Sequence, residues 1–216
     1  MAINNSQHYR VPVICTRGIV VFPGQDVMIE VGREKSLNAV NESSSNYNSM
    51  VWVVCQNDIM VDDPKQENLY QVGTLSRIKI VRRKEGFMRV TFTGVKRARL
   101  AELEDSDDMM IASIRVMEDE IGPKMEETAL VKRIISEFEQ FSNIASAFPS
   151  DVITQLSKGV SAQTLTDQFA QYFPLETPVK QELLEMTSVN DRMVRIIAEL
   201  EKQQQFSKLE STINDK

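Results

Sequence analysis

Residues 72–100 read VGTLSRIKIVRRKEGFMRVTFTGVKRARL, with an alternating segment on each side of a short polar turn. Ile78 and Ile80 fall on one face of the first segment, and apolar side chains alternate with polar ones over residues 88–93. Period-two alternation around Lys84-Glu85-Gly86 predicts a β-hairpin, because successive side chains of a strand point to opposite faces. The glycine of that turn can adopt the positive φ that a three-residue hairpin loop requires. The hairpin needs a sheet to pack into.

The rest of the first half supplies strands but little helix. Apolar or alternating runs predict strands at residues 11–14, 19–22, 27–31, 50–55 and 110–117. A helix is predicted over residues 33–40, a polar loop over 41–49 and disorder over 1–9. Parallel α/β sheets need a helix between successive strands. One short helix is too few, so we predict a mostly antiparallel, barrel-like sheet.

Beyond Gly122-Pro123 the apolar residues follow helical spacing. The stripe of the first amphipathic helix consists of Leu130, Ile134, Phe138 and Phe141. Further helices are predicted up to a capping box at residues 188–191, which opens the last one. That helix outruns its apolar stripe, so we expect the chain to be a fragment of a longer protein. The predicted class is α+β, with a β-rich lobe over 1–121 and a helical bundle with a long C-terminal helix over 122–216.

Composition is that of a globular protein, with 42% hydrophobic and 26% charged residues among 216. No apolar run approaches the roughly 20 residues that cross a bilayer. The N-terminus is polar and lacks a signal-peptide core. These features predict a cytoplasmic protein without a membrane partner. Residues 1–100 carry 14 Lys/Arg and 9 Asp/Glu, a net charge of +5, and the remaining 11 and 22 give −11 to residues 101–216. The asymmetry indicates two units with different surfaces.

The sequence offers little catalytic chemistry. His8 is the single histidine and lies in the predicted flexible start, which disfavours Ser-His-Asp and Cys-His catalysis. One histidine and the distant Cys15 and Cys55 are too few ligands for zinc. Without a Gly-Lys dipeptide there is no P-loop. We therefore predict no catalytic residue, no metal site and no cofactor in this chain.

The basic hairpin at residues 77–99 holds nine Lys/Arg and one acidic residue. Such a face can bind phosphates. Bases stack on exposed aromatic side chains, however, and only Phe87 at the tip is a candidate. The favoured interpretation is a solvated polar face of a half-buried hairpin. A nucleic-acid-binding module, with DNA as partner, is the alternative function.

Several blocks together resemble one family over nearly the whole chain. They are, in order, VPVICTRGIVVFPG at 11–24, VGREKSLNAV at 31–40, DDP at 62–64, LYQVGTLSRI at 69–78, VTFTGVKRARL at 90–100, YFPLETPVKQELLEM at 172–186 and TSVNDR at 187–192. These blocks resemble the N-terminal domain of the ATP-dependent Lon proteases. Cys15-Thr16, Gly18 and Thr93 depart from the residues usual there.

The resemblance implies a PUA-like β lobe followed by a helical bundle. It implies a domain that recognises unfolded, damaged or degron-bearing proteins for degradation and assists assembly of a cytoplasmic homohexamer. In the family, an AAA+ ATPase module, which uses ATP and Mg, and a serine peptidase module with a Ser-Lys dyad follow this domain. Neither module is present in the 216 residues. This fragment is therefore expected not to be an enzyme.

A grip on unfolded chains needs exposed apolar surface. The predicted substrate-binding residues are the Phe22-Pro23 turn, the Phe87-Met88 hairpin tip, and Met193 and Ile197 on the last helix. Ordinary core packing is the alternative interpretation of each.

Overall fold

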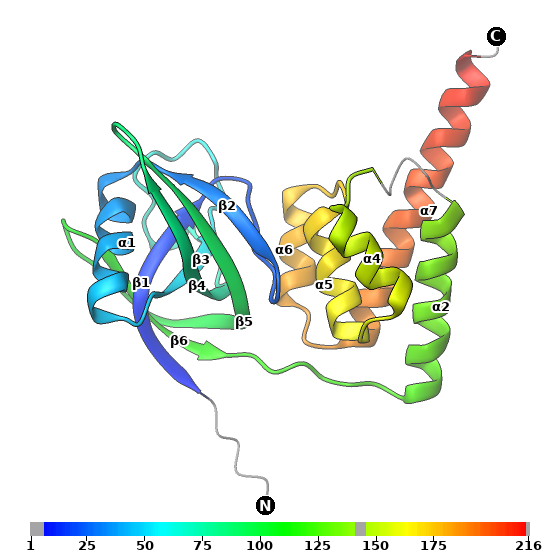
Figure 1. The fold of residues 1–216 in the computed structure, drawn as a ribbon, viewed down its shortest axis with the longest axis horizontal. Helices are drawn as coiled ribbons and strands as arrows, with labels where there is room; N and C mark the ends of the chain where they lie inside the picture. Colours follow the sequence, from blue (N-terminus) through cyan, green and yellow to red (C-terminus); the bar gives the residue numbers. More distant parts are fainter. Residues whose placement is uncertain (1–6, 141–145, 215–216) are drawn as a thin grey trace, which may run out of the picture. The chain divides into compact units, whose positions relative to one another are not determined.

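The computed structural model describes residues 7–140 and 146–214 (Figure 1). The chain divides into two compact units. The β unit extends to Glu118 and includes Lys180–Glu185, and the helical unit comprises Asp119–Val179 and the chain from Met186 onward. The predicted division into 1–121 and 122–216 did not include the return of Lys180–Glu185 to the first unit. That residues 1–121 and 122–216 fold as independent domains stays a prediction.

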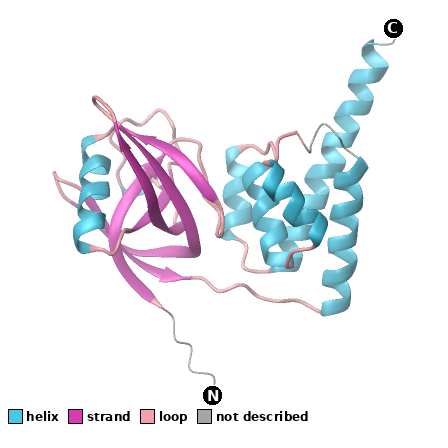
Figure 2. Ribbon diagram, viewed as in Figure 1, coloured by secondary structure: helices cyan, strands magenta, loops and turns pink. Residues whose placement is uncertain are grey.

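The β unit is built on one six-stranded sheet (Figure 2). Its strands are β1 (His8–Thr16), β2 (Asp26–Val31), β3 (Met50–Cys55), β4 (Val72–Arg83), β5 (Met88–Asp105) and β6 (Met110–Val116). Their order is β2-β5-β4-β3-β1-β6, and β5 also pairs with β6. That extra pairing closes five strands into a ring and leaves β2 outside it. Of the pairings between these six strands only β1 with β3 is parallel, so the mostly antiparallel, barrel-like prediction is confirmed.

The predicted hairpin is β4–β5. The Lys84 N–H donates to the Phe87 carbonyl at 2.9 Å, and Gly86 has a φ of +80°. The expectation that Ile78 and Ile80 share a face is wrong, because the register shifts between them. Such a bulge adds one residue to one strand and reverses the facing of those beyond it. Ile78 is therefore 9% exposed and Ile80 44%.

Three local predictions in the first half are corrected by pairing or packing. His8 lies on β1 opposite Arg115 of β6, so it is not in a disordered start; residues 1–6 lie outside the described residues. Residues 19–22 are coil rather than strand, and all but the half-buried Ile19 are buried. Helix α1 (Glu34–Asn46) continues through most of the predicted 41–49 loop. There the Ser43 and Ser44 hydroxyls donate to the Val40 carbonyl, and Ser43 is buried.

Alternate residues of β3 contribute to two cores. Trp52 is fully buried among side chains of β1, β4, β5 and β6, and its Nε1–H donates to the Ala98 carbonyl at 3.2 Å. Val51 and Val53 belong to the second core, with residues of β2 and the Ala39-Val40 face of α1. Both sides of the sheet are thus buried at β3, as its continuous apolar sequence indicates.

The helical unit contains α2 (Lys124–Gln140), α4 (Ser150–Lys158), α5 (Ala162–Tyr172), the start of α6 (Thr177–Glu185), and α7 (Val189–Asn214). Helix α7 packs against α2 and α5. Phe138, Phe148 and Phe169 meet edge to face with ring centroids 5.1–5.5 Å apart. Phe141 of the predicted stripe lies outside the described residues. The sheet followed by helices, with a 26-residue last helix, confirms the α+β prediction. None of the described helices has the length and apolarity that a membrane span requires.

A buried ion pair lies where the chain enters this unit. Arg192 of α7 is 1% exposed and donates from Nη1 to Asp119 Oδ1 at 2.8 Å and to the Met186 carbonyl at 3.2 Å. Its Nε and Nη2 have no partner among the described residues. Asp119 therefore neutralises a guanidinium that water does not reach.

Candidate functional site

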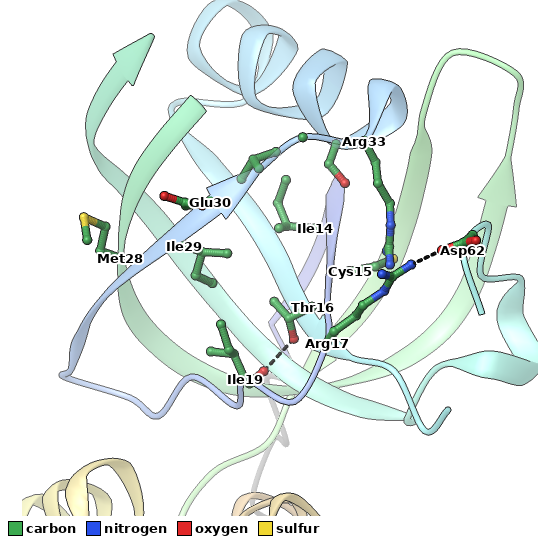
Figure 3. Close-up of a pocket in the computed structure, with 13 residues that line it drawn as sticks. Ile14, Cys15, Thr16, Arg17, Ile19, Met28, Ile29, Glu30, Arg33 and Asp62 are labelled. Atoms are coloured by element: carbon green, nitrogen blue, oxygen red, sulfur yellow. Dashed lines mark hydrogen bonds and ion pairs between the residues drawn. The ribbon is translucent and has the colours of Figure 1, made fainter. Parts of the chain in front are cut away.

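A groove of about 630 Å³ lies in the β unit between β2 and the C-terminal end of β1 (Figure 3). Its lining residues are Ile14, Cys15, Thr16, Arg17, Ile19, Met28, Ile29, Glu30, Val31, Gly32, Arg33, Ser36 and Asp62. The groove exists because β2 leaves the closed ring and pairs with β5 alone among the described strands. Coil residues connect β1 to β2 at one end, where the Thr16 hydroxyl donates to the Ile19 carbonyl at 2.5 Å.

The floor of the groove is apolar. Ile14 and Ile29 are 1% and 6% exposed, and both belong to the core that α1 covers. Figure 3 shows them with Thr16 and Ile19 in the space between the two strands. Met28, on the β2 side, is 60% exposed. A flexible thioether of this kind adapts to varied apolar partners.

The β1 side of the groove carries two cations. Figure 3 shows the guanidinium groups of Arg17 and Arg33 together beside Cys15. Arg17 pairs with Asp62 at 2.5 Å, whereas Arg33 donates from Nη2 to the neutral Gln56 Oε1 at 2.6 Å. Arg33 Nη1 has no partner among the described residues. Burial, and then the neighbouring charge of Arg17, lowers the pKa of Arg33. Arg33 thus makes no hydrogen bond or ion pair with a carboxylate among the described residues, and Asp62 and Asp63 act on it only through longer-range attraction.

Cys15 is an uncharged member of the groove. It is a free thiol, and burial raises its pKa to about 12, so it is protonated at neutral pH. Thiolate is the nucleophilic form of cysteine. The raised pKa therefore disfavours Cys15 as a nucleophile. Among the described residues, no cluster of His, Cys, Asp or Glu could hold a metal ion.

Alkylation should reveal this protection of Cys15. At pH 8 we expect iodoacetamide to modify Cys15 about 1,000-fold more slowly in the native chain than in urea, since the ordinary pKa of the thiol is 9.0. The same raised pKa stabilises the fold below pH 9.0, and this contribution is lost as pH rises towards 12. Peptide mass spectrometry would measure the rate. Equal rates in the two states would contradict the assigned environment.

Four of the six predicted substrate-binding residues are buried, with exposures of 0% for Phe22, 7% for Met88, 0% for Met193 and 6% for Ile197. Pro23 and Phe87 are half-buried. Met88 pairs with Val31 across β2–β5 and joins the core, so the hairpin tip is not a two-residue apolar surface. The role of these residues in substrate binding stays a prediction, and four of them are buried within the described units.

The sequence patterns do not identify the groove residues. Alternation places Met28 and Glu30 in a strand, and helical spacing places Arg33 at the start of a helix. The one sequence signal for the groove is a Met on the polar face of that strand. The groove depends on which strand β2 pairs with, and alternation does not carry that information.

The basic hairpin is partly neutralised. Lys79 pairs with Asp26 at 2.6 Å, Arg89 with Glu30 at 2.8 Å and Lys96 with Glu118 at 3.0 Å. Arg97 is buried, and its Nε donates to the Leu184 carbonyl at 3.1 Å. These contacts reduce the charge that the nucleic-acid alternative requires, and that alternative stays a prediction.

Comparison with known proteins finds matches to one family, the Lon proteases. The family model described as the ATP-dependent protease La (LON) substrate-binding domain matches residues 10–202. A Lon protease of Bacillus thuringiensis is 28% identical over all of this chain and 27% of its own length. A Lon protease of Escherichia coli K12 is 29% identical over 98% of this chain and 27% of its own length. The chain therefore spans about a quarter of the curated relatives it matches.

One solved structure supports the fold. The N-terminal domain of a Mycobacterium avium complex Lon protease superposes with a TM-score of 0.71, covering 89% of this chain and 98% of that one, at 15% identity. At that identity the likeness concerns the arrangement of the elements only.

Proposed function

Because this chain belongs to the substrate-binding domain family of the ATP-dependent protease La (LON), we propose that it recognises unfolded, damaged or degron-bearing proteins and presents them for degradation. The observation that carries the proposal is the groove beside β2, with its apolar floor and its Arg33 cation. Unfolded chains expose the apolar side chains that native proteins bury. They also expose free backbone N–H and C=O groups.

The parent protein is proposed to be an ATP-dependent serine endopeptidase. Its ATPase module, with ATP and Mg, and its Ser-Lys peptidase module would lie in chain beyond these 216 residues. It would act in the cytoplasm in protein quality control, and this domain would assist its assembly into a homohexamer.

Binding by one domain should be weak. Burying two apolar side chains contributes about 2–5 kcal/mol on the usual transfer scale. Ordering the unfolded partner offsets much of that gain. We therefore expect micromolar or weaker affinity per domain, raised by avidity when several domains engage one substrate.

Titration with a permanently unfolded protein tests the proposal. A fluorescent, reduced and carboxymethylated globular protein should bind with a Kd in the micromolar range or above, as measured by anisotropy. The same protein in its native, disulfide-bonded form is the matched control and should not compete. Equal binding of both forms would overturn the proposal. Tight, steeply salt-dependent binding of single-stranded DNA instead would favour the nucleic-acid alternative.

A further inference from the structure

We propose that substrate binds in the groove as an added β-strand. The occupant is an extended segment of unfolded polypeptide that pairs with the open edge of β2 and places one acidic side chain near Arg33. This inference deepens the proposed function and rests on it.

The backbone of β2 has a free edge. In the described pairing, Asp26–Val31 lies against Thr93–Met88 of β5 and against no second strand. Gln25 immediately precedes β2, and its carbonyl accepts from the Gly94 N–H of β5 at 3.0 Å. The backbone carbonyl of Gln25 therefore points towards β5. Backbone groups of alternate residues point to the same side of a strand. Asp26, Met28 and Glu30 therefore direct their N–H and C=O groups to the open edge.

The opposite wall is also an incompletely paired strand. The first part of β1, His8–Pro12, pairs with β6, whereas its second part, Val13–Thr16, pairs with β3 alone among the described strands. Ile14 to Thr16 line the groove from this second part. The space thus lies between two strand edges, each with one side unpaired. A segment of about six residues would match the length of β2 at about 3.3 Å per residue.

The side chains of the groove define the chemistry of that segment. Alternate residues of an added strand would meet the apolar lining side chains that keep exposed surface, half-buried Ile19 and exposed Met28, which favours apolar side chains there. Arg33 is the groove cation that is not paired with a carboxylate among the described residues. Charge complementarity therefore favours one Asp or Glu in the segment, within reach of that guanidinium.

The two acidic side chains of β2 are held by partners on β4 and β5. Asp26 accepts from Lys79 Nζ at 2.6 Å and from the Thr93 hydroxyl at 2.5 Å, and these bonds hold the pKa of Asp26 below its usual range. Glu30 pairs with Arg89. Both acids are thereby turned to β5 and β4, which leaves Met28 between them for a substrate.

Backbone methylation of the ligand tests the strand geometry without altering the protein. The probe is a fluorescent, C-terminally amidated ten-residue peptide of alternating valine and serine with a single glutamate. Two further peptides carry N-methyl groups, one on every valine and one on every serine. The apolar alternation sets the register. Because the proposed pairing is with β2 alone, we expect the peptide methylated on the N–H groups that face β2 to lose at least tenfold in affinity and the other to bind like the parent. Equal affinities of the two methylated peptides would overturn the proposal.

A double-mutant cycle between the protein and the peptide tests the role of Arg33. Arg33→Gln and replacement of the peptide's glutamate by glutamine should each weaken binding about tenfold, and the combination should be no weaker than either alone. Arg99→Gln is the matched control, because Arg99 is exposed, carries the same charge and does not line the groove. Trp52 fluorescence verifies that each variant is folded. Independent, additive losses, or an equal loss in Arg99→Gln, would refute the assignment.

The outcomes separate this inference from the proposed function. If unfolded protein binds but the two methylated peptides are equivalent, strand addition is wrong and substrate recognition stands. If neither unfolded protein nor any peptide binds, both are wrong.

Discussion

Replacing Gly94 by alanine is expected to destabilise the β unit by about 3 kcal/mol, a large overpacking penalty. A Cβ at this position would meet the Phe22 carbonyl oxygen, and would lie 2.8 Å from the Phe22 carbonyl carbon and 3.2 Å from Pro23 Cα. These are backbone atoms, so no side chain can rotate away to relieve the contact. The Gly94 carbonyl also accepts from the Gly24 N–H at 2.8 Å. The strand and the turn would have to separate.

Urea unfolding followed by Trp52 fluorescence measures this effect, since the chain has one tryptophan and it lies in the β unit. The urea midpoint should fall without a change in slope. Gly32→Ala is the matched control, because its Cβ would lie 3.8 Å from Phe87 Cβ, an ordinary contact. Equal midpoints for the two variants would contradict the packing described. Because the Phe22–Gln25 turn leads into β2, Gly94→Ala should also weaken peptide binding.

Asp119→Ala should destabilise the helical unit by about 3 kcal/mol, because it leaves the buried Arg192 guanidinium without a counter-charge. Arg192 already has two nitrogens without a partner among the described residues. An apolar residue of similar length should therefore be tolerated there. We expect the double variant Asp119→Ala, Arg192→Met to recover most of the stability that the single variant loses.

Hydrogen exchange of peptides from α7, followed by mass spectrometry, would measure local stability in this unit. Faster exchange in Asp119→Ala, reversed in the double variant, is the expected result. Arg133→Ala is the control, because the Arg133–Glu201 pair is about half exposed and exposed pairs contribute about 1 kcal/mol or less. If the double variant exchanges as fast as Asp119→Ala, the buried charge is not the cause.

Periodicity and chain-breaking residues, which are visible in the sequence, specify much of this fold. The alternation around Gly86 specified a hairpin, and the change of period after Gly122 specified helices. These features are local, because a strand repeats every two residues and a helix every 3.6. The capping serine at the start of the last helix was also recognised, and its hydroxyl accepts from the Asp191 N–H at 3.2 Å. The family resemblance is local in the same sense, because each sequence block that carries it consists of residues adjacent in the chain.

The tertiary structure alone decided which side chains are available for function. Met88 is buried because it lies opposite Val31, and Gly94 excludes a side chain because the Phe22 backbone crosses it. A bulge beside Ile80 turned that residue outward. Gln181 joined the β unit by donating to the Val72 carbonyl at 2.9 Å. Each outcome depends on partners far apart in the chain, which local periodicity cannot identify. The groove has the same origin, because β2 pairs on one side only and thereby leaves an open edge beside β1.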